Sequence, residues 1–259
     1  MRRPYDIMRG LLEHSVKVDH IFIPGNSLES YLGKFVTNLG VWYNDDVFKL
    51  GLVGSATPVL YKDRYFLLCS KHQLKGVNTE DVCLLYPDGS NVVTSSGVRH
   101  FNTSEETMTS DAYDLAAFEF TAPVLEHPIL KHLFFRFNSL PPDTMTDEII
   151  AFVTAGFPCD DQRYELEERN HIGLVKRILT ALPDHQPHDE SLLQLKYVRP
   201  LDFNPDGLSG GPAFVVQKVD NDFQAFLAGM MVRSGKSHCH ILKVGFLKSF
   251  LDSFLATHD

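Results

Sequence analysis

The sequence lacks any uninterrupted apolar run of the roughly 18 residues that a membrane-spanning helix needs. Its first residues, MRRPYDIMRGLLEH, carry positive charge but no continuous apolar segment, so they do not resemble a secretion signal. A surplus of basic residues is also missing, because the formal net charge is −9. Proteins that bind nucleic acid through its phosphates usually carry the opposite charge. We therefore expect neither a membrane nor a nucleic acid among the partners of this chain.

Cysteines are few and scattered. The four of them, Cys69, Cys83, Cys159 and Cys239, lie in or beside apolar segments. Such cysteines are usually buried free thiols in a reducing compartment, so we expect a cytoplasmic protein. The run His238-Cys239-His240 does not indicate a metal site, because neighbouring residues on a strand point to opposite faces. We expect no metal and no other cofactor.

Short apolar segments separated by polar turns are abundant. From Val41 they read VWY, FKLGLV, PVLY and RYFLLC, and similar runs continue as far as HILKV. Many short strands favour an all-β barrel or sandwich. Helical patterns are confined to the two ends: Tyr5 to Glu13, LESYLGKFV after the capping residue Ser27, and the final VGFLKSFLDSFL. With 44 % hydrophobic residues, the 259-residue chain can bury a sizeable core.

One stretch, NPDGLSGGPAF from Asn204 to Phe214, surrounds a single hydroxyl with small and turn-forming residues. A serine becomes a strong nucleophile when a base takes its proton and amide groups receive the charge that develops on the attacked carbonyl. Glycines around Ser209 let backbone N–H groups approach a substrate closely. Taken alone, the stretch is more typical of a glycine-proline turn between two strands.

The pentapeptide GLSGG also satisfies G-x-S-x-G, the nucleophile elbow of α/β-hydrolases. In that fold a helix begins directly after the serine, and the acid and the histidine follow later in the chain. Here Gly210, Gly211 and Pro212 follow, and then a strand-like AFVV. The chain also ends too soon after Ser209 for the rest of that fold, so the pattern does not indicate an α/β-hydrolase.

Two upstream segments give the serine motif a context. YFLLCSKH runs from an apolar strand into His72, and DLAAFEF places Asp114 at the head of another strand. Together with GLSGGP around Ser209, and in this order, they resemble the trypsin-like (chymotrypsin-fold) serine peptidases, in particular an intracellular bacterial-type member. The resemblance implies an all-β fold of two six-stranded antiparallel β-barrels (chymotrypsin-like), with an N-terminal helical segment and a C-terminal helix.

On this resemblance the chain divides into four parts. Residues 1–40 would be an N-terminal helical extension, and residues 41–125 the first barrel with His72 and Asp114. Residues 126–144 would link the barrels, and their prolines prevent one continuous element. Residues 145–259 would form the second barrel, with Ser209 and the C-terminal helix.

The resemblance also implies a role for each residue of the site. His72, with a reference pKa of about 6.5, would take the proton of Ser209 and return it to the leaving amine. Asp114 would hold the imidazole. Asp111 is a rival for this role, but Asp114 directly precedes the apolar strand, as the acid of the family does. The backbone N–H groups of Gly207 and Ser209 would form the oxyanion hole.

Specificity residues follow from their positions in the same family. The pocket floor is expected at Phe203, and its walls at Val232, Arg233, Ser234 and near Cys239. None of these is an acid at the base of the pocket, so we expect small or medium apolar substrate side chains rather than arginine or lysine. Residues 232–234 are also expected to pair with the substrate backbone as an added strand.

Leu208 departs from the family pattern. Secreted digestive members have an aspartate at this place, which pairs with a new N-terminus after zymogen cleavage, and leucine excludes that route. We therefore expect a regulatory protein partner or a homo-oligomer to control a serine endopeptidase that cleaves protein or peptide substrates through an acyl-enzyme. Two alternatives stay open: a catalytically silent domain that only binds peptides, and an effector module of a larger complex.

Overall fold

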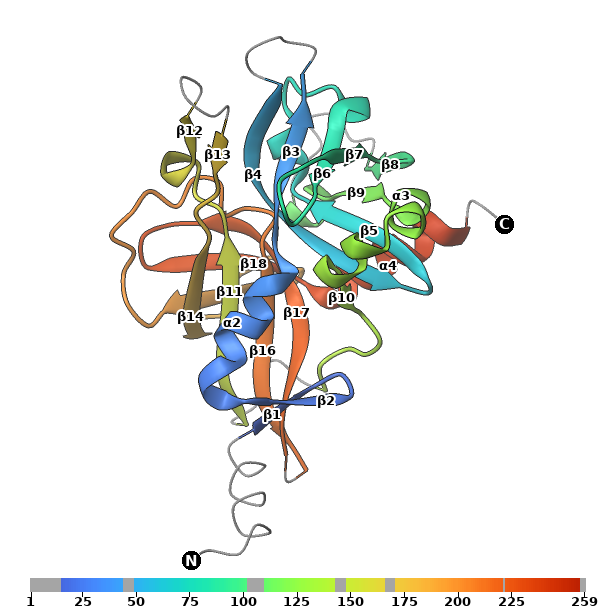
Figure 1. Cartoon of the computed structure of the whole chain (residues 1–259). Helices are drawn as coiled ribbons and strands as arrows, with labels where there is room; N and C mark the ends of the chain where they lie inside the picture. The colour runs from blue at the N-terminus through green and yellow to red at the C-terminus, as the bar shows by residue number, and fades with distance from the viewer. Residues whose placement is uncertain are drawn as a thin grey trace, which may run out of the picture.

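The structure is a computed structural model that describes residues 15–43, 49–101, 110–142, 148–165, 171–220 and 222–256. Strands dominate it and form two lobes (Figure 1), which confirms the expected all-β fold. The helix expected at Tyr5 to Glu13 lies outside the described residues. No helix among the described residues is long and apolar enough to cross a membrane.

The C-terminal lobe is a closed, antiparallel, six-stranded barrel. Around it run β11 (Ile149–Gly156), β14 (Arg177–Pro183), β15 (Leu192–Tyr197), β18 (His238–Lys243), β17 (Asp222–Ser234) and β16 (Pro212–Val219). The barrel closes because β16 pairs with both β11 and β17. Buried side chains such as Phe152, Leu193 and Ile241 form its interior cluster, as in other small barrels. A hairpin of β12 (Arg163–Glu165) and β13 (His171–Gly173) lies between β11 and β14 in the chain.

The N-terminal lobe is a curled half-barrel. Its strand order is β7 (Val92–Thr94), β6 (Val82–Leu85), β3 (Thr37–Trp42), β4 (Leu50–Tyr61), β5 (Arg64–Cys69), β9 (Ala116–Glu119) and β8 (Gly97–His100). The end strands β7 and β8 are joined by Ser95 and Ser96, whose N–H groups donate to the carbonyls of Val82 and Glu119. The chain itself thus connects the two ends of this sheet. The resemblance implied that this lobe, the expected first barrel, is a six-stranded barrel, whereas β7 and β8 do not pair with each other.

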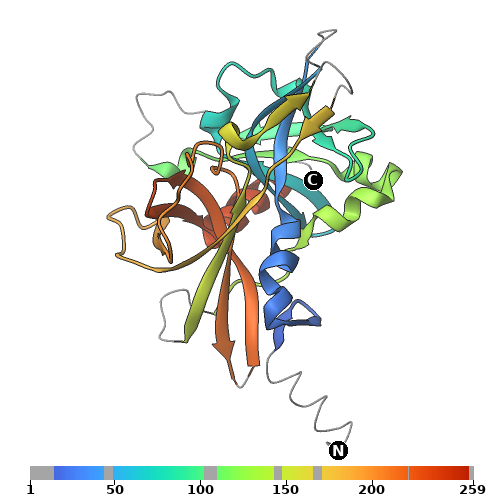
Figure 2. The same cartoon turned by 60° about the vertical axis from the view of Figure 1, so that its left-hand side comes forward.

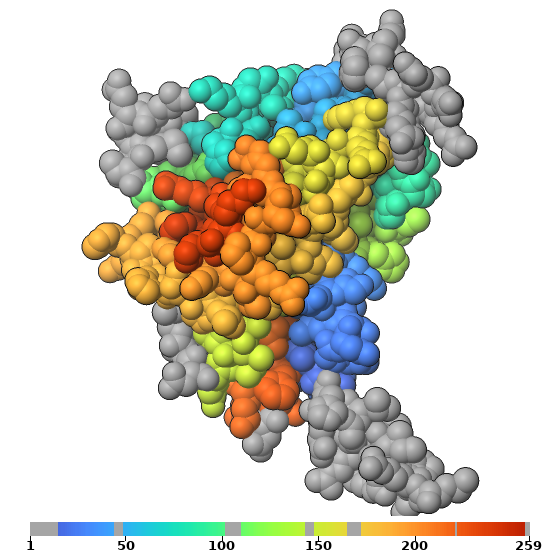
Figure 3. Space-filling view, turned by 90° about the vertical axis from the view of Figure 1, so that its left-hand side faces the viewer, coloured from blue at the N-terminus to red at the C-terminus, as the bar shows by residue number. Residues whose placement is uncertain are grey.

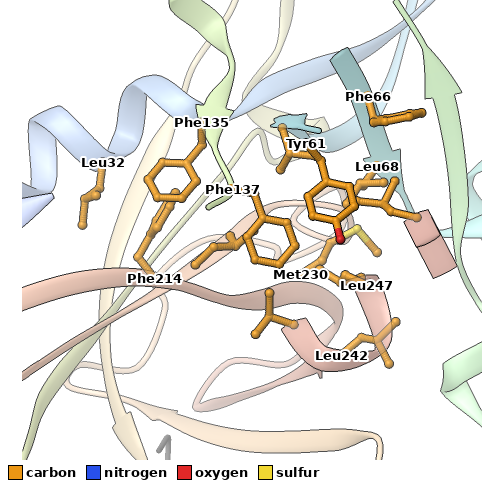
Figure 4. Packing of buried hydrophobic residues seen from close by; sticks show 14 of the residues in the cluster. Leu32, Tyr61, Phe66, Leu68, Phe135, Phe137, Phe214, Met230, Leu242 and Leu247 are labelled. Carbon is orange, nitrogen blue, oxygen red and sulfur yellow. The ribbon is translucent and has the colours of Figure 1, made fainter. Parts of the chain in front are cut away.

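The largest apolar cluster joins the two lobes (Figure 4). Phe66 and Leu68 of β5 share it with Met230 of β17 and Leu247 of the C-terminal helix α4 (Val244–Ala256). At the end of α4, the ring of Phe254 packs edge-on against Phe66, with 5.2 Å between the centroids. The expected terminal helix is confirmed. It packs against residues of both lobes and fixes one lobe relative to the other.

The segment before the half-barrel contains strands that the sequence did not indicate. β1 (Ser15–Val18) pairs in parallel with β17 and antiparallel with β2 (Ile21–Pro24). The helix expected after Ser27 is present as α2 (Leu28–Leu32), but it is only five residues long. Figure 2 shows this segment running along one side of the molecule. Val16 and Val18 bury their side chains in the shared cluster, which holds the strand pair in place.

The expected linker between the lobes contains no long element. α3 (Thr121–Glu126) is followed by a 3-10 turn at Pro128–Leu133 and by the two-residue strand β10 (Phe135–Arg136), which pairs with β4. Prolines cannot donate a backbone hydrogen bond and clash with the preceding turn of a helix, so they keep these elements short.

Candidate active site

His72 and Asp114 are neighbours because the strands that carry them are paired. His72 lies in a 3-10 turn (Lys71–Leu74) just after β5, and Asp114 lies just before β9. β5 and β9 run antiparallel with Cys69 opposite Ala116, so the end of one strand lies beside the start of the other. Figure 3 faces a side on which the C-terminal barrel (yellow to red) adjoins the half-barrel.

Asp114 binds His72 through both carboxylate oxygens. Its Oδ2 lies 2.7 Å from Nδ1 of the His72 ring, and its Oδ1 accepts the backbone N–H of His72 at 2.8 Å. The Asp114 side chain is 10 % exposed, whereas that of His72 is 53 % exposed. The hydrogen bond to Asp114 raises the pKa of His72 above 6.5, although partial burial acts in the opposite direction. The pair can therefore hold the imidazole with Nε2 left for another group.

Ser209 lies in a loop that we call the serine loop (residues 204–211), between β15 and β16. Its Oγ donates to the carbonyl of Val232 at 3.1 Å. In the part of the chain that the structure describes, no hydrogen bond joins this hydroxyl to His72. The two segments are nevertheless connected, because the Gln73 side chain, next to His72, donates to the backbone carbonyl of Ser209 at 2.9 Å.

On either side of Leu208, the backbone N–H groups of the serine loop have no acceptor among the described residues. The amides of Asp206, Leu208, Gly210 and Gly211 donate, in turn, to Asn204 Oδ1 and to the carbonyls of Pro205, Met231 and Leu208. Those of Gly207 and Ser209 donate to no acceptor among the described residues. Gly207 and Ser209 are both half-buried, so an atom from outside the protein can reach their N–H groups. These two amides, the ones expected from the sequence, are therefore available to an oxygen atom of a ligand.

Glycine is required at two positions of the serine loop. Gly207 has a φ of +95°, and a Cβ there would lie 2.6 Å from the Phe157 carbonyl oxygen. Gly210 has a φ of +86°, and its Cβ would lie 2.0 Å from the carbonyl oxygen of Ser55. Residues with a side chain rarely adopt such φ values. The glycines thus allow the loop to pack directly against the backbone of both lobes.

The residues expected to form a specificity pocket differ in how far their side chains are exposed. Val232 is buried and Arg233 is exposed. Ser234 Oγ is 2.8 Å from the hydroxyl of Tyr197. Cys239 is fully buried, and Phe203 is half-buried beneath the guanidinium of Arg177, 5.0 Å from the ring centroid. Of the side chains of these five expected residues, those of Arg233, Ser234 and Phe203 reach the surface.

The rival acid Asp111 has a different partner from His72. Its carboxylate binds the guanidinium of Arg233 at 2.5 Å, and this ion pair connects the half-barrel to β17. Both charges act on His72: Asp111 raises its pKa and Arg233 lowers it. The geometry therefore places Asp114 in contact with the imidazole and Asp111 at the rim of the same site.

Sequence reasoning missed the side chains that hold the serine loop from behind. Ser55 Oγ donates to the Gly207 carbonyl at 2.6 Å, and Thr57 Oγ1 donates to the Gly210 carbonyl at 2.7 Å. Both residues lie on β4 and are buried. A signal was present in the sequence, because a strand reading GSATP places two hydroxyls at alternate positions on one face. Nothing in it specified their acceptors.

The cysteines of the chain are not joined by disulfides. All four cysteines are free; Cys159 is exposed and the other three are buried. Burial raises the pKa of the buried thiol of Cys83 to about 12. Among the described residues, no group of three His, Cys, Asp or Glu side chains is arranged to hold a metal ion.

Neither protein-family models nor curated protein sequences give a match to this chain. A closed six-stranded barrel beside a curled half-barrel is consistent with a chymotrypsin-like fold. Because one fold can carry many functions, the function has to be inferred from the site itself.

Proposed function

We propose that the protein is a trypsin-like serine endopeptidase that hydrolyses peptide bonds of protein substrates. The observation that carries the proposal is the pair of unpaired amides, at Gly207 and Ser209, which flank the candidate nucleophile. The carboxylate-bound imidazole of His72, on the turn connected to the same loop through Gln73, supports it.

Acylation begins when the Ser209 hydroxyl leaves the Val232 carbonyl and turns to Nε2 of His72. Nε2 takes the hydroxyl proton while Oγ forms a bond to the carbonyl carbon of the scissile peptide. The electron pair of the C=O bond moves to its oxygen, which the N–H groups of Gly207 and Ser209 stabilise. The C–N bond then breaks, and the imidazolium gives its proton to the departing amine. Asp114 stabilises the imidazolium throughout.

Deacylation repeats these steps with water. His72 takes a proton from a water molecule, whose oxygen attacks the ester carbon of the acyl-enzyme. The tetrahedral intermediate collapses, the bond to Ser209 Oγ breaks, and the imidazolium returns its proton to that oxygen. The products are a carboxylic acid, an amine and the original enzyme, so no oxidant, reductant or cofactor is consumed.

A fluorophosphonate probe tests this proposal, because it reacts only with an activated serine. We expect one labelled residue, Ser209, identified by peptide mass spectrometry, and no label in Ser209→Ala. Ser96→Ala is the matched control, since Ser96 Oγ is exposed and donates to a backbone carbonyl far from the loop. Absence of labelling in the folded wild-type protein across neutral and mildly alkaline pH would contradict the proposal.

A catalytically silent peptide-binding domain is the second candidate, favoured by one observation. Ser209 Oγ is bonded to the Val232 carbonyl rather than to His72. On this alternative the wild-type protein stays unlabelled, and wild type and Ser209→Ala bind the same peptides with equal affinity. The two candidates therefore differ in the outcome of a single labelling experiment.

Control by a partner or by self-association belongs to the same proposal. Leu208, which precedes the serine, is fully buried in the cluster inside the C-terminal barrel and cannot pair with a new N-terminus. We expect labelling per molecule to depend on protein concentration or on an added partner. Equal labelling of monomer and assembled forms, separated by size-exclusion chromatography, would exclude this control.

A further inference from the structure

Gln73 directly follows His72, and its side-chain amide spans the gap to the serine loop. Oε1 accepts the backbone N–H of Ser70 at 2.8 Å. Nε2 donates to two carbonyls, that of Ser55 at 3.1 Å and that of Ser209 at 2.9 Å. We propose that Gln73 is a positioning residue, which sets the candidate nucleophile against the candidate base. The proposal rests on the peptidase function proposed above.

The orientation of this amide is fixed by its partners. An amide oxygen only accepts and an amide NH₂ only donates. Turning the Gln73 amide over would place its NH₂ against the N–H of Ser70 and its oxygen against two carbonyl oxygens, so all three interactions would become repulsive. The side chain thus has one orientation that satisfies all its neighbours, and that orientation points its donors at the serine loop.

The two backbone segments that lie against the Gln73 side chain have glycine, and therefore no side chain, at the point of contact. A Cβ at Gly54 would lie 2.4 Å from Nε2 of Gln73, and a Cβ at Gly210 would lie 2.8 Å from its Oε1. Both glycines have positive φ, +139° and +86°. β4 and the serine loop therefore leave a slot that fits a planar amide, and the half-buried Gln73 side chain occupies it.

The contact to Ser209 fixes the residue that carries the nucleophile. Its carbonyl accepts from Gln73 and also from the N–H of Ser55, at 3.3 Å. The next N–H, of Gly210, donates to the Met231 carbonyl at 2.7 Å. Gln73 is the only one of these partners that belongs to the same turn as His72. It therefore controls the separation between base and nucleophile, on which the rate of attack depends steeply.

Two substitutions distinguish positioning of the serine loop from a second role, in which Gln73 only stabilises the turn that carries His72 through its bond to the Ser70 N–H. Gln73→Met has a similar length and removes all three hydrogen bonds. Gln73→Glu keeps an acceptor for the Ser70 N–H but places a carboxylate oxygen against the carbonyls of Ser55 and Ser209. If Gln73 only shapes the turn, glutamate restores activity. If it positions the serine loop, glutamate fails as methionine does.

The matched control is Gln162, whose side-chain amide has the same pattern of bonds within the C-terminal lobe. It donates to the carbonyls of Pro158 and Val175, at 2.7 and 3.0 Å, and accepts the Val175 N–H at 3.1 Å. Gln162→Met loses as many hydrogen bonds as Gln73→Met and leaves the His72 turn untouched. We expect it to be labelled at the wild-type rate.

The measurements are the second-order rate constant of fluorophosphonate labelling as a function of pH, kcat and KM for p-nitrophenyl acetate, and thermal unfolding. Rates are compared on the high-pH plateau, because the carboxylate of Gln73→Glu lies beside His72 and raises its pKa. We expect both Gln73 variants to lose up to about 100-fold in labelling rate and kcat. KM should change little, and the pH midpoint of Gln73→Met should stay at the wild-type value, since Asp114 still holds His72.

The outcomes decide between the two proposals. A wild-type protein that is never labelled contradicts the peptidase function itself. A labelled wild type with Gln73→Glu at the same plateau rate overturns only the role of Gln73. If Gln73→Met does not fold, Gln73→Asn replaces it: its amide is one methylene too short for the Ser209 carbonyl, and a wild-type rate in that variant also overturns the role.

Discussion

Ser55 on the half-barrel donates its hydroxyl hydrogen to the carbonyl of Gly207 on the serine loop, over 2.6 Å. The Oγ of Ser55 also accepts the backbone N–H of Phe157, at 2.8 Å. Ser55 is fully buried, so bulk water does not reach its hydroxyl. A single hydroxyl therefore ties β4 to two segments of the C-terminal barrel, directly behind one of the unpaired amides.

Ser55→Ala should destabilise the protein. The change leaves the buried Phe157 N–H and the half-buried Gly207 carbonyl without this partner, and an unsatisfied buried group costs about 1–3 kcal/mol. We expect the free energy of unfolding in urea to fall by that amount. The exposed Ser96→Ala should change it by less than about 0.5 kcal/mol. Equal stability of Ser55→Ala and wild type would show that the interlobe bond has no energetic role.

Asp114→Asn should change both the rate of the proposed reaction and its pH dependence. The base must be neutral to act, so the wild-type rate rises with pH through the raised pKa of His72. Asparagine removes the largest cause of that raised pKa and leaves partial burial, which lowers it. We expect the midpoint to move to lower pH while the plateau falls by about 10⁴-fold. Fluorophosphonate labelling from about pH 5 to about pH 9 brackets this titration.

An NMR titration of the His72 ring gives the same information if Asp114→Asn is too slow to label. In folded protein, a midpoint identical to that of the wild type would mean that Asp114 does not control the protonation of His72.

Removing either partner of the Asp111–Arg233 ion pair should shift the pH midpoint of labelling, and the two shifts should have opposite signs. Asp111 raises the pKa of His72 and Arg233 lowers it. Asp111→Asn should therefore move the pH midpoint of labelling down, and Arg233→Gln should move it up. Both shifts should be smaller than that of Asp114→Asn and should shrink in high salt, because the Arg233 side chain is 68 % exposed. Shifts of the same sign in the two variants would contradict this electrostatic account.

The three chemical groups of the site were readable because each depends on local context. A histidine ending an apolar strand, an acid opening one and a serine among glycines are patterns of a few residues, and the structure brings His72 and Asp114 into contact. The orientation of the Ser209 hydroxyl was not readable, since it depends on a carbonyl that lies 23 positions away. Its role in catalysis stays a prediction.

The supporting contacts escaped the sequence for the same reason. Ser55 and Gly207 are 152 positions apart, and Gln73 and Ser209 are 136 apart. Their pairing depends on how two lobes dock rather than on a repeating pattern. The parallel pairing of β1 with β17 was missed likewise, because SVKV alternates like any half-buried strand and carries no sign of its partner. Hydrophobic periodicity specifies which faces are buried but not which faces meet.

Asp252 predicts how stability depends on pH. It accepts from Lys248 at 2.6 Å, and from Lys62 and the Tyr61 hydroxyl at 2.7 Å each, so it attaches α4 to the turn between β4 and β5. The hydrogen bonds from Lys248, Lys62 and Tyr61 lower the pKa of Asp252 well below 3.8. A carboxylate with a lowered folded-state pKa stabilises the protein above its unfolded-state pKa and loses this effect as the pH falls.

Asp252→Asn should therefore lower the free energy of unfolding at neutral pH, and the difference from wild type should shrink as the pH falls below about 4. Glu126→Gln is the control, because Glu126 is exposed and forms no ion pair among the described residues. Urea unfolding at a series of pH values measures both variants. A stability difference that persisted unchanged at low pH would mean that Asp252 acts by packing, since only a contribution from the ionised carboxylate disappears on protonation.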